Sequence, residues 1–281
     1  MKRDSVHRRR CAIVIALAAA LAALILGAAR ANAAGGAHYY LALGDSLAAS
    51  AQPNGDFQHG YAEQLYASLQ QQDPGLQLVK LGCGGESTTS MIYGSQDPSV
   101  AVSCGPPSFY RQTYPHRTQL AEAVAFLEAH RRFVSLVTID IGANDLPNVS
   151  AIATNLPVIL DELREAAGSA IPILGMNYYD PNLATIWLAG GSLADLDAEI
   201  AFAVAFNNFL EGFYVTAGDP YADVESAFQV TDTTLVNGTP LDVIRECQWT
   251  WVCFPPPLGP DVHANTAGYG VIAQAFLEVL P

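Results

Sequence analysis

The sequence predicts an α/β fold in which a parallel sheet is covered by helices on both faces. Three observations support this prediction. Short apolar segments of strand length alternate along the chain with segments of helical periodicity. Residues 133–141 are apolar with little alternation, which is typical of a central strand buried on both faces. No internal repeat, low-complexity block or interdomain linker interrupts the mature chain, so we expect one domain.

The elements of the first half begin with a strand at residues 39–43, a short apolar run that ends at a glycine. Residues 61–69 place apolar side chains at every fourth position, which predicts a helix with one buried face. A second strand follows at residues 76–81. Residues 82–116 are rich in Gly, Ser and Thr, and we expect a long functional loop that holds a short helix.

The second half continues the alternation of strands and helices. Leu120, Val124 and Leu127 indicate an amphipathic helix before the strand 133–141. The remaining predicted elements are a helix at 152–166, a strand at 171–176, a helix at 193–217 and a final helix whose buried stripe is Tyr269, Ile272 and Phe276.

The N-terminus has the pattern of a secretory signal. Five basic residues among the first ten precede an uninterrupted apolar run over residues 11–29, and small residues over 31–34 follow it. An Ala-x-Ala site predicts cleavage after Ala33, so residues 1–33 form the signal and residues 34–281 the mature domain. The alternative is a retained membrane anchor, because the run is about long enough to span a bilayer. We favour cleavage and secretion, since small residues rather than aromatic anchors close the run. The basic pair Arg9-Arg10 fits twin-arginine export and general export equally well.

The charge of the mature chain excludes several classes of partner. The whole chain has a formal charge of -14, but residues 1–33 hold six basic residues and one acidic residue, a net of +5. The remainder therefore carries -19, from 7 basic and 26 acidic residues. Such a chain cannot neutralise phosphates, so nucleic-acid binding is excluded. Stable association with anionic membranes after signal cleavage is disfavoured for the same reason.

The cysteines also fit an exported protein. Without Cys11, the chain keeps four: Cys83, Cys104, Cys247 and Cys253. An even number in an exported chain indicates two disulfides with three possible connectivities, of which we favour the local pairs Cys83–Cys104 and Cys247–Cys253. A metal site is the alternative. It has little support, because neither pair forms a C-x-x-C motif or has a histidine at ligand spacing.

Four polar segments follow predicted strand ends or precede the last helix. They are Gly44-Asp45-Ser46-Leu47, Gly82-Cys83-Gly84-Gly85-Glu86, Gly142-Ala143-Asn144-Asp145 and Asp261-Val262-His263. Ligands of an open parallel sheet bind where its strands end. Together the segments supply a hydroxyl nucleophile, a base, a carboxylate and hydrogen-bond donors from glycine backbone and an amide side chain. These are the groups that acyl transfer to water requires.

In this order the segments resemble the SGNH/GDSL hydrolases, a superfamily of esterases, lipases and related acyl hydrolases. The resemblance extends from Leu41 to Phe276, and the motifs LGCGGEST, IDIGAND and MNYYDP are most similar to exported actinobacterial-type members. It implies a flavodoxin-like three-layer α/β/α sandwich with a five-stranded parallel sheet. It also implies a serine esterase or lipase that acts on a small-molecule, lipid or glycan ester without a cofactor.

By similarity, Ser46 is the nucleophile and His263 the base. The oxyanion hole would consist of the backbone N–H groups of Ser46 and Gly85 and the side-chain amide of Asn144. General chemistry agrees with these roles: the histidine takes the serine proton and returns it to the leaving alcohol, while the donors face the oxygen on which charge develops.

The acidic residue of the triad departs from the family pattern. The family places its acid three residues before the histidine, a position that Pro260 occupies here, whereas Asp261 lies two residues before His263. A shift of one residue in an extended segment turns a side chain to the other face. We expect a bend in the loop that lets Asp261 orient His263. The alternative is a backbone carbonyl of residues 249–260, since a main-chain acceptor can also hold a ring N–H.

Two other functions compete with this interpretation. An α/β-hydrolase would place its serine mid-chain with acid and base well separated, and neither holds here. A catalytically silent exported binding module could use the same scaffold, because a fold does not fix a function. The complete Ser, Gly, Asn and His set argues against it. Seven residues near the last predicted strand end and in the small cysteine loop, most of them aromatic, suit an acyl pocket or ordinary packing equally well: Tyr178, Tyr179, Pro181, Leu183, Trp187, Trp249 and Trp251.

Overall fold

The computed structural model of the chain describes residues 38–94, 114 and 118–281. The predicted signal at residues 1–33 and Cys104 lie outside the described residues. The cleavage site and the Cys83–Cys104 pair therefore stay predictions.

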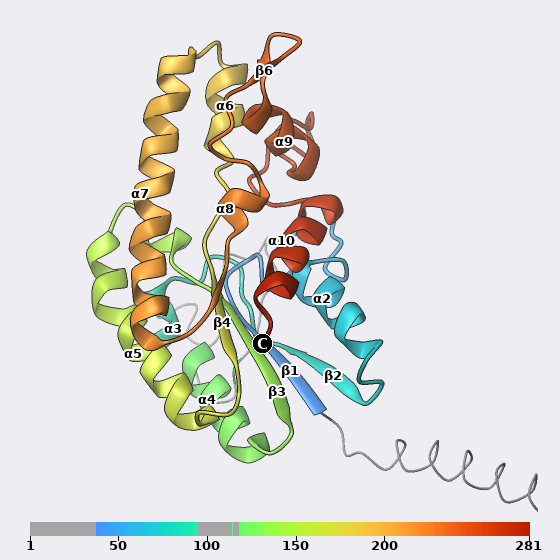
Figure 1. The fold of residues 1–281 in the computed structure, drawn as a ribbon, viewed down its shortest axis with the longest axis vertical. Coiled ribbons are helices and arrows are strands. Elements are labelled where there is room, and N and C mark those ends of the chain that lie inside the picture. The colour runs from blue at the N-terminus through green and yellow to red at the C-terminus, as the bar shows by residue number, and fades with distance from the viewer. Residues whose placement is uncertain (1–37, 95–113, 115–117) are drawn as a thin grey trace, which may run out of the picture. The chain divides into compact units, whose positions relative to one another are not determined.

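Five parallel strands form one sheet in the order β2-β1-β3-β4-β5 (Figure 1). They are β1 (His38–Gly44), β2 (Leu76–Lys80), β3 (Val134–Asp140), β4 (Ile173–Met176) and β5 (Tyr221–Ala222). The predicted parallel sheet is confirmed, and the predicted central strand is β3, in which every residue except Ser135 is buried. β5 was not predicted from the residues, because a two-residue strand carries no periodicity.

Helices cover both faces of this sheet, as predicted. Figure 1 shows α2 (Tyr61–Gln70) and α10 (Thr266–Val279) on one side. The other side carries α3 (Thr88–Tyr93), α4 (Gln119–His130), α5 (Val149–Ala167) and α7 (Leu193–Ala217). The predicted stripe of the last helix is buried, and the ring of its Phe276 stacks on Tyr61 of α2 with the centroids 5.1 Å apart. The three-layer sandwich thus forms around an apolar β1 and β3.

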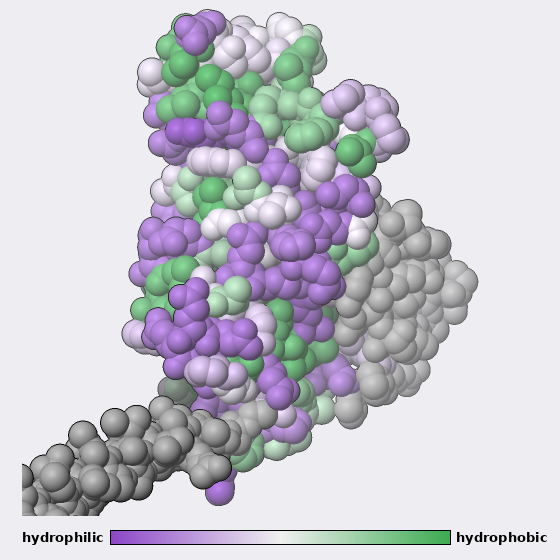
Figure 2. Space-filling model, turned by 90° about the vertical axis from the view of Figure 1, so that its right-hand side faces the viewer, coloured by the Kyte–Doolittle hydropathy of each residue, from purple (hydrophilic) through white to green (hydrophobic). Residues whose placement is uncertain are grey.

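A second group of short elements lies beyond the carboxyl ends of the strands, around one end of α7 (Figure 1). It contains α6 (Asn182–Leu188), α8 (Val224–Ala227), α9 (Leu241–Trp249) and the antiparallel hairpin of β6 (Leu235–Val236) and β7 (Thr239–Pro240). The sequence did not predict these elements, since most are shorter than two helical turns. Figure 2 shows a largely hydrophilic middle on the α2 and α10 side, with hydrophobic side chains gathered toward the end where α6, β6 and α9 lie.

The long helix α7 was predicted with the observed bounds, Leu193–Ala217. Within the described residues it is the one helix whose length and apolar composition would allow it to cross a membrane. It packs against α5 and α6, and one side of it buries Leu196, Phe206, Leu210 and Tyr214. Packing within the domain thus buries one side of this helix. Phe202, on the same helix, is 51% exposed and faces the cavity described below.

Candidate active site

The predicted nucleophile lies in a tight turn directly after β1. The backbone N–H of Ala51 donates to the carbonyl of Ser46 at 2.9 Å, and the N–H of Ala49 donates to the carbonyl of Asp45 at 3.1 Å. Asp45 rather than Ser46 caps this turn, because its Oδ1 accepts the N–H of Leu47 at 2.8 Å. The half-buried Ser46 side chain is therefore not used as a cap and lines a cavity.

Gly44 permits the close approach of β1 to β3 at this point. Its φ of +130° is outside the range that side chains tolerate, and a Cβ atom would lie 2.0 Å from the carbonyl oxygen of Asp140. No other residue fits there. The turn that holds Ser46 consequently starts from a fixed backbone position.

The two remaining oxyanion-hole candidates lie on neighbouring loops. Gly85, which follows β2, has a φ of +79° within a turn closed by the hydrogen bond from Glu86 N–H to the Cys83 carbonyl at 3.1 Å. Asn144 lies in the short 3-10 helix η2 (Ala143–Asp145) after β3. Its Nδ2 donates to the Glu86 carbonyl at 3.0 Å, and an amide has a second N–H to offer to a ligand. The side chain of Asn144 also lines the cavity that Ser46 faces.

Asp145 fastens the same two loops together. Its Oδ2 accepts the backbone N–H of Thr88 at 2.8 Å, and its Oδ1 accepts the Thr88 hydroxyl at 2.6 Å. Both residues are buried. Burial raises the pKa of Asp145, and the bonds from Thr88 oppose that shift. The carboxylate thus holds η2 against the start of α3 and fixes the distance between Asn144 and the Gly85 turn.

The histidine and its acidic partner lie before α10. Nδ1 of His263 is 2.7 Å from Oδ1 of Asp261, and the same oxygen accepts the backbone N–H of His263 at 2.9 Å. This double contact bends the chain over residues 261–263, so a carboxylate two residues before the histidine reaches its ring. Burial alone would raise the pKa of Asp261, but the hydrogen bonds and the charge of His263 outweigh it and lower the pKa. Asp261 is ionised at neutral pH.

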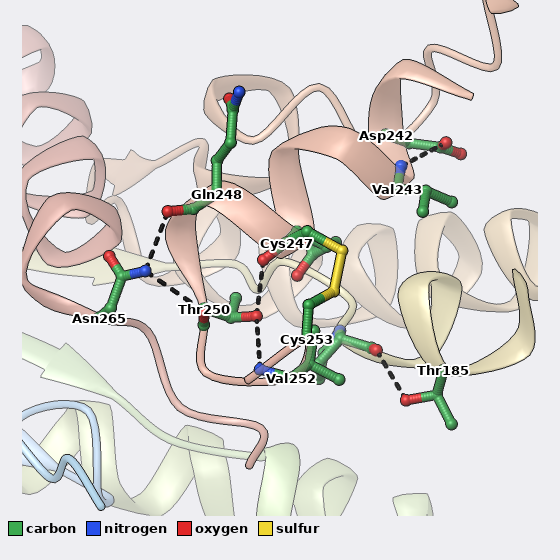
Figure 3. Close-up of a disulfide and its surroundings, with 11 residues drawn as sticks. Thr185, Asp242, Val243, Cys247, Gln248, Thr250, Val252, Cys253 and Asn265 are labelled. Carbon is green, nitrogen blue, oxygen red and sulfur yellow. Dashed lines mark hydrogen bonds between the residues drawn. A yellow bond between two sulfur atoms is a disulfide. The ribbon is translucent and has the colours of Figure 1, made fainter. Parts of the chain in front are cut away.

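The loop that carries His263 is anchored to the segment closed by the disulfide Cys247–Cys253, one of the two pairs predicted (Figure 3). The His263 carbonyl accepts the N–H of Trp251 at 3.0 Å. Asn265 caps α10 with its Oδ1, while its Nδ2 donates to the carbonyls of Gln248 and Thr250 at 2.9 and 3.2 Å. The disulfide therefore braces the backbone on which the histidine is mounted.

Sequence reasoning missed a buried layer behind these loops. Gln119, the first residue of α4, accepts the N–H of Gly44 at 2.6 Å and donates to the Gly44 carbonyl at 2.9 Å. The same Nε2 is 3.0 Å from Oε2 of Glu86. Burial raises the pKa of Glu86 to about 7, against the bonds from Ser90 and Gln119. Gln119 so connects the end of β1 to the Gly85 turn. A single glutamine at a helix start gives no sequence signal for such a role.

One cavity of about 190 Å³ brings the predicted residues together. Ser46, Asn144 and His263 all line it, and its remaining walls come mainly from the segment after β4 and from α7. Tyr178, Tyr179 and Pro181 are on that wall, whereas Leu183 is buried in the core and Trp187 packs against it. Trp251, also buried, donates its indole N–H to Gln52 at 3.2 Å. Of the seven residues that the sequence analysis named for an acyl pocket or packing, three thus face the cavity and the other four pack in or against the core. Gly85 is exposed and does not line the cavity.

A parallel α/β/α sandwich with a serine, a histidine and a carboxylate beside one cavity at its carboxyl edge is the arrangement of a hydrolytic enzyme. The model of the GDSL-like Lipase/Acylhydrolase family matches residues 42–271. The chain belongs to this family and is a carboxylic ester hydrolase.

Solved structures share the fold at low sequence identity. A protein from Parabacteroides merdae, described as a candidate GDSL-like lipase, aligns with a TM-score of 0.54 and 12% identity over 86% of this chain and 95% of its own. Axe2, an acetylxylan esterase from Geobacillus stearothermophilus, aligns with a TM-score of 0.51 and 16% identity over 87% of this chain and 94% of its own. At such identities the similarity shows the fold alone. A sequence search among curated proteins finds no match.

Proposed function

We propose that the chain is an exported serine esterase in which Ser46, His263 and Asp261 act together. The observation that carries this proposal is the 2.7 Å contact between Asp261 and the ring of His263, a residue that lines the same cavity as Ser46. Asp261 fixes the ring so that Nδ1 carries the proton and Nε2 is the base. His263 takes the proton of Ser46 as its oxygen attacks the ester carbonyl.

The developing oxyanion would be held by the N–H groups of Ser46 and Gly85 and by the second amide N–H of Asn144. This assignment of the oxyanion hole is supported by the hydrogen bonds that fix Asn144 to Glu86 and Asp145 to Thr88, because donors held in place in advance stabilise charge without reorganising. His263 then gives its proton to the leaving alcohol. Water repeats the sequence on the acyl-enzyme and releases the acid.

The substrate would be a small ester with an apolar group. A cavity of about 190 Å³ is smaller than the roughly 300–1,000 Å³ of pockets that enclose drug-sized ligands. Its walls include Leu146, Phe202, Phe206 and Val262. The two tyrosines present ring surface, since the hydroxyl of Tyr178 donates to Asp45 and that of Tyr179 to the Val262 carbonyl. A short-chain acyl ester fits these walls better than a charged substrate does.

Export through a cleaved signal at residues 1–33 remains part of the proposal. Its support is the residue order of that segment and the Cys247–Cys253 disulfide, which suits an oxidising compartment. Sequencing the N-terminus of protein recovered from the medium of an expressing bacterium should give Ala34 as the first residue. Protein retained in the membrane fraction with residues 1–33 attached would contradict export.

Labelling with a fluorophosphonate probe tests the mechanism directly. We expect mass spectrometry to find the adduct on Ser46, and hydrolysis of p-nitrophenyl acetate to stop in parallel. Ser46→Ala should abolish labelling and hydrolysis and keep the circular dichroism spectrum. Ser135→Ala, on the exposed position of β3, is the matched control and should behave as wild type. Folded protein that neither labels nor hydrolyses any ester in an acyl series would instead favour a binding module.

A further inference from the structure

Two buried carboxyl groups meet beneath the turn that carries Ser46. Asp45 follows β1 and Asp140 ends the neighbouring β3, and they are 2% and 0% exposed. The Asp45 N–H donates to the Asp140 carbonyl at 3.0 Å, and the two side chains accept the N–H groups of consecutive residues, Leu47 and Ala48, so the carboxyl groups lie next to each other. Two neighbouring carboxyl groups buried from water repel strongly when both are ionised, so this arrangement favours one proton on the pair.

Each carboxyl group also accepts a backbone N–H from the turn. Asp45 Oδ1 accepts the N–H of Leu47 at 2.8 Å, and Asp140 Oδ2 accepts that of Ala48 at 3.1 Å. Aromatic hydroxyls complete the pair: Tyr178 donates to Asp45 at 3.0 Å and Tyr61 donates to Asp140 at 2.7 Å. Ser46 lies between Asp45 and Leu47, so the pair grips the backbone on both sides of it.

We propose that Asp140 is a positioning residue of the esterase: as a carboxylic acid that donates its proton to Asp45, it completes a carboxyl pair of single negative charge that holds the backbone around Ser46. This inference rests on the proposed role of Ser46. Asp140 touches no substrate and acts through the turn.

The surroundings of the pair favour a single charge. Burial raises the pKa of Asp140 well above its usual range, and the negative charge of Asp45 raises it further, against the bonds from Tyr61 and Ala48. Burial likewise raises the pKa of Asp45, which the contact with Asp140 opposes. The other titratable groups that face the pair are the hydroxyls of Tyr40, Tyr61, Tyr178, Tyr179, Tyr214 and Tyr269 and the side chains of Glu86 and His263. Because the charge of His263 favours the ionised form of Asp45, we place the proton on Asp140.

Two substitutions of similar size separate the pair's chemistry from mere space filling. In Asp140→Asn an amide N–H can replace the shared proton, and the single charge on Asp45 is kept. We expect kcat to stay within about tenfold of wild type, the cost of exchanging one hydrogen bond for another. Asp140→Leu removes the proton that would be shared with Asp45 and leaves the Ala48 N–H without its acceptor. We expect kcat to fall about 100-fold or more with KM little changed, as for a nucleophile displaced by about 1 Å.

Infrared difference spectroscopy reads the shared proton itself and does not depend on Asp140→Leu folding. Wild type at neutral pH should show the carbonyl stretch of a protonated carboxylic acid, and the wild type minus Asp140→Asn spectrum should contain that band. Asp242→Asn is the matched control, because it removes another buried carboxyl group, on α9, and should leave kcat and this band unchanged. Absence of the band, or an Asn variant as slow as the Leu variant, would overturn the inference.

Failure of the proposed function gives a different result. If Ser46 does not react with the fluorophosphonate in wild type, the esterase mechanism fails, while the infrared band still reports the pair. If Ser46 reacts in wild type and equally fast in Asp140→Leu, the mechanism stands and the positioning role alone is wrong.

Discussion

Asp261→Asn tests how the carboxylate supports His263. One oxygen, Oδ1, accepts both the backbone N–H and the ring nitrogen of His263, at 2.9 and 2.7 Å. An amide whose oxygen takes that place keeps both contacts and loses only the charge. Hydrogen bonds to charged acceptors contribute about 1 kcal/mol more than neutral ones, so kcat/KM should fall roughly five- to tenfold. The fall in kcat/KM would be far larger if the amide instead made the ring adopt the other tautomer, with its proton on Nε2.

Asp261→Ala removes both contacts together. The ring bond to a carboxylate and the backbone bond together contribute about 3 kcal/mol, which predicts a fall in kcat/KM of roughly 100-fold. The alanine variant should also be less stable near neutral pH. The folded-state pKa of Asp261 is lowered, so its stabilisation is present above the unfolded-state pKa and is lost as the pH falls through the folded-state value. The stability difference between wild type and Asp261→Ala should therefore shrink in acid.

Steady-state hydrolysis of p-nitrophenyl acetate over a range of pH, with denaturant unfolding at two pH values, measures both effects. A near-normal rate in Asp261→Ala would refute the reasoning and point to a backbone acceptor. One carbonyl within residues 249–260 that lies close to this loop is that of Trp251, which accepts the N–H groups of Phe254 and Asp261 at 3.2 and 3.3 Å. An asparagine variant as slow as the alanine variant would show that the charge, and not the geometry of Oδ1, dominates.

Three further variants test the cavity and its supports. Asn144→Ala should lower kcat about 100- to 1,000-fold with little change in KM, as measured by initial rates; a loss confined to KM would exclude an oxyanion role. Replacing Cys247 and Cys253 by serine should cost about 2 kcal/mol for a loop this short and lower Tm by roughly 4–8 °C in calorimetry; an unchanged Tm would contradict the bracing of the histidine loop. Phe206→Ala should enlarge the α7 wall and raise kcat/KM for p-nitrophenyl hexanoate relative to acetate by about tenfold; an unaltered ratio would remove Phe206 from the substrate site.

The sequence predicted the sandwich well because the elements of its centre have strong periodicity. β3 and α7 are long enough to show, respectively, an unbroken apolar run and a helix-length pattern. The predicted stripe of α4 was correct at Leu120 and Leu127, whereas Val124 is half-buried and Ala123 is buried instead. The short elements around α6 and α9 were missed, because periodicity cannot emerge from one or two turns whose burial is decided by distant segments.

The sequence predicted the residues of the candidate site that have a recognisable chemistry, but not the residues that support them. A serine and an asparagine after strand ends and a histidine before a helix have a chemistry that indicates their use, and the family pattern gives their order. The bend that brings Asp261 to His263 depends on one oxygen accepting two donors, a local geometry that spacing alone does not reveal. Gln119 gave no signal because its partners, Gly44 and Glu86, are 75 and 33 positions away.

These supports share one physical property: each joins the ends of two different strands or loops through a buried polar side chain. Asp140 joins β3 to the Ser46 turn, Gln119 joins β1 to the Gly85 turn, and Asp145 joins η2 to α3. A buried polar group that loses its partner is costly, so each connection is cooperative with its neighbours. Combined substitutions at Asp140 and Gln119, which both act on the end of β1, should therefore reduce kcat by a factor different from the product of the single effects. Independent effects would mean that the turns are held separately, and that the geometry around Ser46 does not depend on a continuous network.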